Sequence, residues 1–456
     1  MTNTRPQRLR VAIDAQVVPW RNGGVATVLT ALIRALGRLP DGDEHYTVVA
    51  RNSEEASFWA PFLGREQSLV DAEEHQRRLR VPSGHRVALK RWIKRGLWRV
   101  ARPMIDPILA RANSERQWPE VPVSNGFYES LGCDVLHFPW QHYVLCALPT
   151  IFNPHDLQHL HYPQFFSTRD LVHRETIYPA GCRLSQSVVV GSQWAKEDIV
   201  SQYGVDPRKI QVVPEAPPSS HAGEPSAERL DGVRAKYGLP NDFLLYPAIT
   251  WPHKNHLRLF EALAVLRDRR QITVPLVCTG SPHQPLWPHL QSTVKELGLD
   301  GQVWFAGFVS DDDLRAFQRL ARGLIIPSLF EASSLPIFDA WLDGVPVGCS
   351  NATALPEQVR DAALLFDPTD VNAIGDAVVR IMVDEEMRSD LRARGYGRLK
   401  DFDLMRTAKA YRAVYRRVGR RALTEEDRWL LKWDWMTGTQ QCEDRRSPDG
   451  QTRTRA

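Results

Sequence analysis

Short runs of Val, Ile, Leu and Phe alternate with longer amphipathic segments along nearly the whole chain. Near-continuous apolar runs predict strands covered on both faces, which is typical of parallel sheets. The segments between them have helical length, so each strand–helix–strand stretch predicts a right-handed βαβ unit. The pattern therefore predicts an α/β protein.

The strand candidates divide into two groups. In the first half of the chain they are Leu9–Ala15, Tyr46–Ala50, Asp134–Pro139, Ser187–Ser192 and Ile210–Pro214. In the second half they are Phe243–Ile249, Val274–Gly280, Val303–Val309, Gly323–Ser328, Val345–Ser350 and Ala363–Asp367. Helices are predicted, among other segments, at Val25–Gly37, Trp194–Tyr203, Asn255–Asp268 and Asp311–Leu320.

The strand–helix pattern restarts after a stretch rich in Pro, Ser, Ala and Gly, Glu215–Ala227, which predicts a hinge. We expect two doubly wound (Rossmann-like) domains, residues 1–218 and 228–398, facing each other across a cleft. Helices within 399–435 should pack back toward the first domain, and the polar tail 436–456 should be disordered. Ligands bind at the carboxyl ends of such strands, so the active site is expected in the cleft.

Composition narrows the class of protein. Apolar residues make up 43% of the chain and charged residues 25%, which is typical of soluble globular proteins. We find no apolar stretch long enough to span a bilayer and no secretory signal, so a cytoplasmic location is expected. The six cysteines form no C-x-x-C pair, which favours reduced thiols over disulfides or a zinc knuckle.

The positive charge is concentrated in a predicted basic helical insertion at about residues 75–118. Ten Lys or Arg residues and no acidic residue lie between His75 and Ile105, and removing them takes the net charge from +4 to −6. Within it, Leu89–Arg102 predicts a basic, Trp-bearing amphipathic helix that suits an anionic membrane surface. The alternative is an ordinary surface helix packed on its own domain. Nucleic-acid binding is not expected, because no binding motif accompanies the charge.

The richest chemistry lies between Pro327 and Pro368. A helix should begin near Leu335, with Ser334 as a good N-cap and Pro336 suited to the first helical position. The free N–H groups at this helix start would form an anion site suited to a diphosphate. Asp339, one turn into the helix, can turn toward a ribose, and Glu331 can face the group attached to the phosphate.

The sequence of this segment resembles the E-x7-E signature of retaining GT-B glycosyltransferases, family 4 in particular. The matching stretches include Pro-Ser-Leu-Phe-Glu, Gly-Val-Pro-Val and Leu-Pro-Glu. The resemblance extends over about forty residues. It implies that Glu331 is catalytic and contacts donor-sugar hydroxyls, and that Asp339, in place of the usual Glu, contacts the ribose. Ser334 and Leu335 are implied donor-binding residues at the helix start, where Ser333-Ser334 replaces the family's Phe-Gly.

A second segment, Tyr246–Asn255, resembles the family's G-x-x-x-P-R-K-N motif. The resemblance implies that Lys254 binds the donor diphosphate, where a cation would neutralise charge that builds up on the leaving phosphate. His253 stands at the position of the family's arginine, so it is carried over as a further donor-binding residue, and phosphate binding should depend more on Lys254.

The first half of the chain matches the family more loosely. Gly23-Gly24 before a helix resembles the glycine-rich acceptor-side loop, and Gly24 is taken as donor-binding. His155 lies near the position of a family His that faces the donor sugar, and it is taken as catalytic. After the final Val-Val-Pro, Glu215-Ala216 replaces the usual Asn-Gly.

The resemblance implies transfer of a sugar, with retention, from a UDP- or GDP-sugar to a glycan or lipid-linked acceptor. GDP-mannose is one candidate donor, and surface polysaccharide assembly at the inner face of the plasma membrane is the expected setting. No metal or other cofactor is implied. A GT-B epimerase or phosphorylase and a non-catalytic sugar- or lipid-binding scaffold stay open. So does a zinc hydrolase built on the H-x-x-x-H spacing of His155 and His159.

Overall fold

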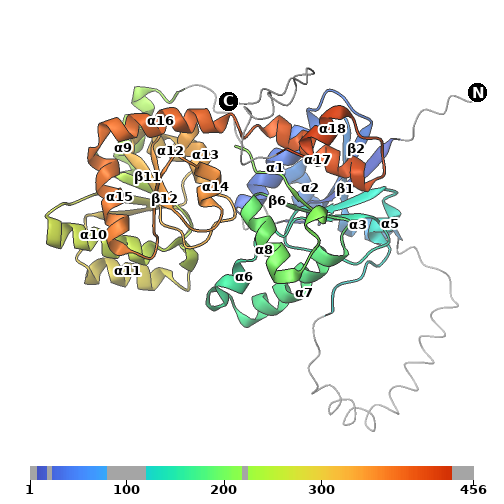
Figure 1. The fold of residues 1–456 in the computed structure, drawn as a ribbon, viewed down its shortest axis with the longest axis horizontal. Coiled ribbons are helices and arrows are strands. Elements are labelled where there is room, and N and C mark those ends of the chain that lie inside the picture. The colour runs from blue at the N-terminus through green and yellow to red at the C-terminus, as the bar shows by residue number, and fades with distance from the viewer. Residues whose placement is uncertain (1–7, 18–22, 80–119, 218–223, 434–456) are drawn as a thin grey trace, which may run out of the picture.

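Two parallel β-sheets, one in each half of the chain, organise the protein into two lobes (Figure 1). The computed structural model describes residues 8–17, 23–79, 120–217 and 224–433. The predicted membrane-docking segment Leu89–Arg102 and the predicted disordered tail 436–456 lie outside the described residues.

The N-terminal sheet has seven parallel strands in the order β3-β2-β1-β4-β5-β6-β7. They are β1 (Leu9–Asp14), β2 (Glu44–Ala50), β3 (Gln67–Asp71), β4 (Val135–Phe138), β5 (Thr150–Phe152), β6 (Ser187–Val190) and β7 (Ile210–Val212). The C-terminal sheet has six parallel strands in the order β10-β9-β8-β11-β12-β13. They are β8 (Leu244–Pro247), β9 (Leu276–Thr279), β10 (Val303–Gly307), β11 (Gly323–Ile326), β12 (Val347–Ser350) and β13 (Leu364–Phe366).

Both sheets share one topology, in which the chain starts at a central strand, moves outward to one edge, and returns to continue on the other side. This is the doubly wound order, and it leaves a crevice outside the carboxyl ends of the two strands where the direction reverses. Those strands are β1 and β4 in the first sheet and β8 and β11 in the second. The prediction of two doubly wound domains is confirmed.

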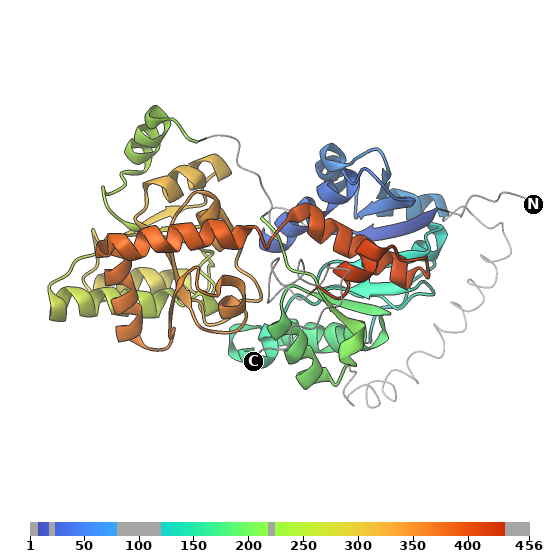
Figure 2. The same ribbon diagram turned by 45° about the horizontal axis from the view of Figure 1, so that its top comes forward.

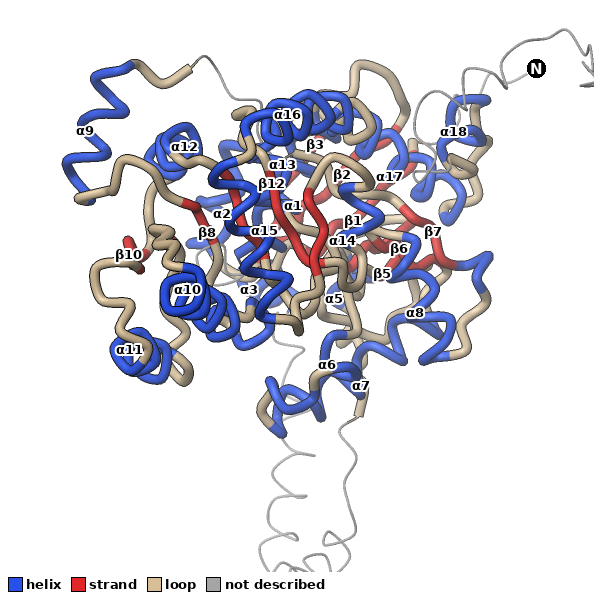
Figure 3. Tube along the Cα trace, turned by 60° about the vertical axis from the view of Figure 1, so that its left-hand side comes forward, coloured by secondary structure: helices blue, strands red, loops and turns tan. Residues whose placement is uncertain are grey.

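Helices surround the strands of both sheets, as the blue helices and red strands of Figure 3 show. In the N-terminal lobe they are α1 (Gly23–Gly37), α2 (Ser53–Trp59), α3 (Ala72–Leu79), α5 (Phe127–Ser130), α6 (Gln158–His161), α7 (Thr168–Leu184) and α8 (Gln193–Tyr203). In the C-terminal lobe they are α9 (Ala227–Tyr237), α10 (His256–Arg270), α11 (Trp287–Glu296), α12 (Asp311–Leu320), α13 (Leu335–Leu342), α14 (Leu355–Val359), α15 (Val371–Val383) and α16 (Glu385–Leu399). The 3₁₀ turns are η1 (Ala60–Phe62), η2 (Pro163–Phe165), η3 (Pro207–Lys209) and η4 (Pro252–Lys254).

The chain returns to the N-terminal lobe after α16. Figure 2 shows α16 running from the C-terminal lobe toward the other one, where α17 (Leu404–Val418) and α18 (Glu425–Leu430) follow. Apolar residues of α17 share a core with those of α1 and β1. The last helices therefore complete one face of the N-terminal sheet.

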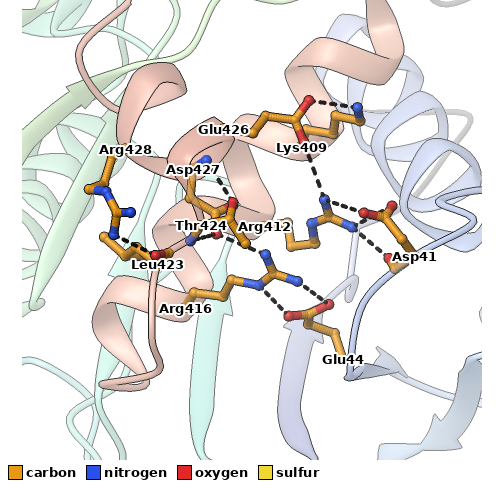
Figure 4. A network of polar contacts seen from close by, with 10 residues as sticks. All are labelled: Asp41, Glu44, Lys409, Arg412, Arg416, Leu423, Thr424, Glu426, Asp427 and Arg428. Atoms are coloured by element: carbon orange, nitrogen blue, oxygen red, sulfur yellow. Dashed lines mark hydrogen bonds and ion pairs between the residues drawn. The ribbon is translucent and has the colours of Figure 1, made fainter.

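A buried ionic network fixes these helices to the first lobe (Figure 4). The Arg416 guanidinium donates to the Glu44 carboxylate at 2.6 Å and to Asp427 at 2.8 Å. Arg412, which is 1% exposed, donates to the carbonyl of Asp41 at 2.6 Å. Burial alone would raise the pKa of Asp427, but the hydrogen bond and charge of Arg416 and the hydrogen bonds of Thr424 together outweigh burial and hold the pKa below 3.8.

Candidate active site

Lys254 and Glu331 meet at the carboxyl edge of the C-terminal sheet. Lys254 ends η4 in the loop after β8, and Glu331 lies in the loop after β11. Since β8 and β11 are neighbours at the point where the winding reverses, their following loops converge. The Lys254 Nζ is 2.5 Å from the Glu331 Oε1, and the side chains are 22% and 8% exposed. The two residues implied by the resemblance are thus brought together.

The backbone around Glu331 is held from several sides. The Thr353 hydroxyl accepts a hydrogen bond from the Glu331 N–H at 3.0 Å and donates to its carbonyl at 2.7 Å. Two residues earlier, the Leu329 N–H donates to the His253 carbonyl at 2.8 Å, which ties this loop to the one that carries Lys254. The carboxylate and the ammonium group are therefore presented by loops that are bonded to each other.

The start of α13 differs in detail from the prediction. Ser334 occupies the N-cap, but its side chain makes no capping bond, and Pro336 is the second helical residue. The Ser334 N–H donates to the side-chain carbonyl of Gln358 at 2.9 Å, and the Gln358 amide donates back to the Ser334 carbonyl at 2.9 Å. Ser334 is therefore not a free donor for a phosphate, because Gln358 already satisfies its N–H.

Gly24 and Leu335 face each other across the two lobes. A Cβ built at Gly24 would lie 3.6 Å from Cδ1 of Leu335, and one at Gly23 would lie 4.0 Å from the side chain of Ile249. The glycine-rich start of α1 thus comes against the site in the C-terminal lobe, where a larger residue would fill the space between them.

Asp339 lies one turn into α13 and is largely buried. Its burial, with smaller contributions from Asp343 and Asp311, raises the pKa of the carboxyl from 3.8 to about 7. A carboxyl group with such a pKa is close to half-ionised at neutral pH. It can accept hydrogen bonds from hydroxyl groups once it is ionised.

His155 occupies a strained position at the mouth of the N-terminal sheet. Its backbone has a φ of 64°, which is uncommon for a residue with a side chain. The ring Nε2–H donates to the Pro139 carbonyl at 2.9 Å, and Nδ1 lies 3.8 Å from the Glu215 carboxylate. Burial alone would lower the pKa of His155, but the Glu215 carboxylate, the Pro139 carbonyl and the charge of Asp156 together outweigh burial and raise the pKa above 6.5.

Both ring nitrogens of His155 thus face acceptor oxygens. This arrangement fits the doubly protonated, cationic imidazole, which has no lone pair with which to take a proton. His155 is placed to contribute positive charge and shape, and it is poorly placed to act as a general base.

The zinc-hydrolase alternative required His155 and His159 on one helical face. The helix α6 begins only at Gln158, so His155 precedes it, and His161 is paired with Asp198 at 2.9 Å. Across the ranges that the structure describes, no group of three His, Cys, Asp or Glu side chains could hold a metal ion. The helical H-x-x-x-H interpretation is therefore wrong.

His253 is largely buried beside Lys254. Burial first, and then the charge of Lys254, lower the pKa of His253 well below 6.5, so its ring is neutral at physiological pH. The His253 ring therefore adds no positive charge for a phosphate. Of His253 and Lys254, only Lys254 carries a positive charge.

An apolar pocket opens beside these residues, at the carboxyl ends of β8, β9 and β10. Its empty volume is about 350 Å³, including open space at the mouth. Its lining includes Thr250, Gly280, Trp287, Phe305 and Gly307. Gly280 has a φ of 115°, and a Cβ there would come within 2.7 Å of the Ala248 carbonyl, so only glycine fits. The pocket could hold a flat apolar group such as a nucleobase.

Sequence reasoning missed the residues that support Glu331. Thr353 and Gln358 bond to the backbone of the loop and of the helix start, and neither belongs to an acidic or basic motif. Their nearest signal is their place between Asn351 and Val359, a stretch of the sequence that the family resemblance covers as a whole.

Two family models match the chain. The model described as Glycosyl transferases group 1 matches residues 233–398, and the model described as Glycosyltransferase Family 4 matches residues 22–216. Together they cover both lobes and the loops that carry Glu331, Lys254 and Gly24. The chain belongs to the group 1 glycosyltransferases. The resemblance stated from the E-x7-E segment is thereby confirmed.

Relatives of this family member include several bacterial mannosyltransferases. An O-antigen chain mannosyltransferase B from Escherichia coli is 29% identical over 54% of the chain and 65% of the relative. A serotype-specific mannosyltransferase WbdA, also from Escherichia coli, is 32% identical over 40% of the chain and 23% of the relative. The chain thus spans less than two thirds of the length of either relative.

Solved structures show the same architecture. An Anabaena protein, Alr3699/HepE, in complex with UDP and glucose has a TM-score of 0.60 at 15% identity and covers 89% of this chain and 99% of its own. WaaG, described as a glycosyltransferase involved in lipopolysaccharide biosynthesis, has a TM-score of 0.59 at 14% identity, with the same coverage. The group 1 member therefore has the GT-B fold. Within the described residues no helix has both the length and the apolar character to cross a membrane.

Proposed function

We propose that this protein transfers a sugar from a UDP- or GDP-sugar to a glycan or lipid-linked acceptor, with retention of the anomeric configuration, in polysaccharide assembly. The observation that carries the proposal is the contact between Lys254 and Glu331 at the winding reversal of a GT-B sheet. That crevice is where a doubly wound sheet binds nucleotides.

The donor would lie along the carboxyl edge of the C-terminal sheet. Its base would enter the apolar pocket bordered by Thr250 and Phe305, and the Asp339 carboxylate would accept hydrogen bonds from its ribose. Lys254 would hold the diphosphate, and Glu331 would bind hydroxyls of the sugar. Since Lys254 is only 22% exposed, its charge acts on the departing phosphate with little screening by water.

Transfer then needs one exchange of bonds at the anomeric carbon. The bond to the diphosphate oxygen breaks, and the acceptor hydroxyl oxygen bonds on the same face. The hydroxyl proton passes to the departing phosphate oxygen, which serves as the base. This assignment agrees with the geometry of His155, whose ring nitrogens both face acceptor oxygens.

The names of the relatives suggest the order in which the candidate donors should be tested. Those named above are mannosyltransferases, so GDP-mannose is the first donor to test. A structural neighbour was solved with UDP and glucose, so UDP-glucose is the second. For the acceptor, the O-antigen chain in the name of one relative favours a growing glycan chain.

The decisive experiment measures transfer with purified full-length protein. Each nucleotide sugar is incubated with a glycan acceptor, and both nucleotide diphosphate release and the new glycosidic bond are measured, with the anomeric configuration read by NMR. Glu331→Gln and Lys254→Met should each reduce kcat by about 10²-fold or more. The matched controls Glu296→Gln and Lys295→Met, at exposed positions near the end of α11, should not change kcat.

The outcomes separate the alternatives. Unchanged turnover in both site variants would refute the assigned site. Conversion of the donor without a new glycosidic bond would indicate an epimerase. Release of sugar 1-phosphate from the glycan with inorganic phosphate would indicate a phosphorylase, and nucleotide-sugar binding without turnover would indicate a scaffold. Inversion of configuration would refute the retaining mechanism.

Membrane association remains a separate proposal that rests on Leu89–Arg102. We expect the protein to sediment with vesicles that contain anionic lipid and not with neutral vesicles. Replacing Lys90, Arg91, Lys94 and Arg95 with Gln should abolish sedimentation and leave transfer to a soluble acceptor unchanged. Equal sedimentation with both vesicle types would contradict an electrostatic docking helix.

A further inference from the structure

The residue that precedes Glu331 crosses from one lobe into the other. Phe330 belongs to the loop after β11 of the C-terminal lobe, and it is 2% exposed. Its ring centroid lies 5.5 Å from that of His161, 5.4 Å from Trp194 and 6.2 Å from Tyr162. All three belong to the N-terminal lobe, and we call them the aromatic socket. Tyr162 and Trp194 meet the Phe330 ring edge-to-face, at interplanar angles of 83° and 81°, which is a geometry in which aromatic rings attract each other, and His161 is tilted at 40°.

The aromatic socket is itself firmly built. The His161 ring is hydrogen-bonded to both oxygens of the Asp198 carboxylate at 2.9 Å. The Tyr162 hydroxyl donates to the Leu329 carbonyl at 3.3 Å, which adds a polar contact across the lobes one residue before Phe330. The position of Phe330 is thus defined by side chains that have fixed partners of their own.

A second contact between the lobes supports the same socket. The Glu357 carboxylate, from α14 of the C-terminal lobe, accepts hydrogen bonds from the backbone N–H of Gln193 at 2.7 Å and of Trp194 at 2.9 Å. These groups open α8, where N–H groups have no partner within the helix. The carboxylate thus fixes the start of the helix that carries Trp194, and it does so from the same lobe as Phe330.

We propose that Phe330 is a positioning residue, which couples the contact between the lobes to the orientation of the Glu331 carboxylate toward the donor sugar. The inference rests on the proposed function. His253 and Thr353 hold this loop from its own lobe, and Tyr162 and the aromatic socket hold it from the other lobe, so the orientation of Glu331 depends on both lobes. When the lobes separate, the ring leaves its socket and Glu331 loses one of its supports.

The coupling has a kinetic signature. The residues assigned to the nucleotide, which are Lys254, Asp339 and the apolar pocket, all belong to the C-terminal lobe. Loss of the aromatic socket should therefore leave affinity for the nucleotide diphosphate unchanged and lower kcat. A residue that only stabilises the fold would not separate the two quantities in this way.

The experiment uses variants from both lobes in the full-length protein. Phe330→Ala should lower kcat on the order of 10²-fold, as expected when a reacting group is misplaced by about 1 Å. Its Kd for nucleotide diphosphate should stay within about twofold of wild type. Trp194→Ala should have the same effect from the other lobe, and the double variant should be no worse than Phe330→Ala alone. Phe330→Tyr should restore most of the activity.

Two further variants guard against a loss of folding. Phe330→Leu keeps apolar volume without the ring and should show the same split between kcat and Kd. Phe317→Leu is the matched control, because Phe317 is fully buried and packs on Tyr237 at 5.0 Å within one lobe. It should lower the melting temperature and leave kcat unchanged. If Phe330→Ala and Phe330→Leu keep wild-type kcat, or if losses in the double variant multiply, the inference is overturned.

Small-angle X-ray scattering tests the coupling without turnover. With nucleotide diphosphate bound, the wild type should keep a smaller radius of gyration than Phe330→Ala, whose lobes separate. Identical radii would overturn the inference even if the wild type transfers no sugar from any donor. A wild type that transfers no sugar but shows the expected difference in radius would refute the proposed function and leave the contact between the lobes standing.

Discussion

Replacing Asp339 with Asn should stabilise the protein at alkaline pH while it weakens nucleotide binding. Burial raises the pKa of the Asp339 carboxyl from 3.8 to about 7. Well below pH 4 the Asp339 carboxyl is protonated in both the folded and the unfolded states, so the group has no effect on stability. Between about pH 4 and pH 7 the unfolded chain ionises first, and the free energy of unfolding falls as pH rises.

The size of this effect follows from the shift in pKa. One pKa unit corresponds to about 1.36 kcal/mol, so a shift of about three units gives an upper bound of roughly 4 kcal/mol. The carboxyl keeps some contact with water, which reduces its cost of ionisation, so we expect a loss of about 2–4 kcal/mol in the wild type above about pH 7. Asn cannot ionise, so the variant should lack this fall.

Urea unfolding of both proteins between about pH 4 and pH 8.5 measures the difference directly. The two free energies of unfolding should be similar near pH 4, and the variant should become the more stable protein as pH rises. Asp300→Asn, at an exposed position after α11, is the matched control and should follow the wild type. Parallel curves for wild type and Asp339→Asn would refute the account of a buried, unpaired carboxyl.

The affinity of the wild type for nucleotide should rise with pH, whereas its stability falls. In the proposed function the ionised carboxylate accepts hydrogen bonds from ribose hydroxyls, so wild-type affinity should rise as pH passes about 7, relative to Asp339→Asn. The ratio of the two affinities isolates Asp339, because the phosphates of the ligand titrate equally in both experiments. A ratio that does not change with pH would exclude Asp339 from the ribose site.

Three other substitutions test other parts of the structure. Arg416→Met should cost about 3–5 kcal/mol in urea unfolding, because it leaves Glu44 buried without its partner, whereas a loss under about 1 kcal/mol would indicate a merely superficial pair. Glu215→Gln should lower the pKa of His155, since burial would then be opposed only by the Pro139 carbonyl and Asp156, and an unchanged NMR titration of the ring would contradict the pairing. Gly280→Ala should destabilise the fold by about 1–3 kcal/mol and weaken nucleotide binding in calorimetry, because the new Cβ meets a backbone carbonyl at 2.7 Å; unchanged affinity would place the base outside this pocket.

The fold could be predicted wherever an apolar run is long and bounded by clear helices. The central strands β1, β8 and β11 are of this kind. Two strands are absent from the predicted set for physical reasons. The edge strand β3 (Gln67–Asp71) is only half-buried along its length, so it lacks an apolar run. The strand β5 (Thr150–Phe152) offers only Ile151 and Phe152 as apolar residues between Pro149 and Pro154, so it lacks a run as well.

The candidate site was predictable to the extent that it is local. Glu331 and Lys254 each follow a recognisable strand and precede a helix, so the neighbouring sequence predicts their position at the edge of a sheet. The doubly wound order then brings the two loops together. The pairing of His155 with Glu215 depends on residues sixty positions apart, and no local pattern distinguishes it from two separate charges.

By itself, the sequence determined the alternation of strands and helices, the family, and the residue types offered at each strand end, because burial and backbone preference act between near neighbours. The tertiary structure decided the rest. It set the ionisation of Asp339 and seated Phe330 among rings of the other lobe, since burial and ring contact depend on segments that only folding brings within a few ångströms.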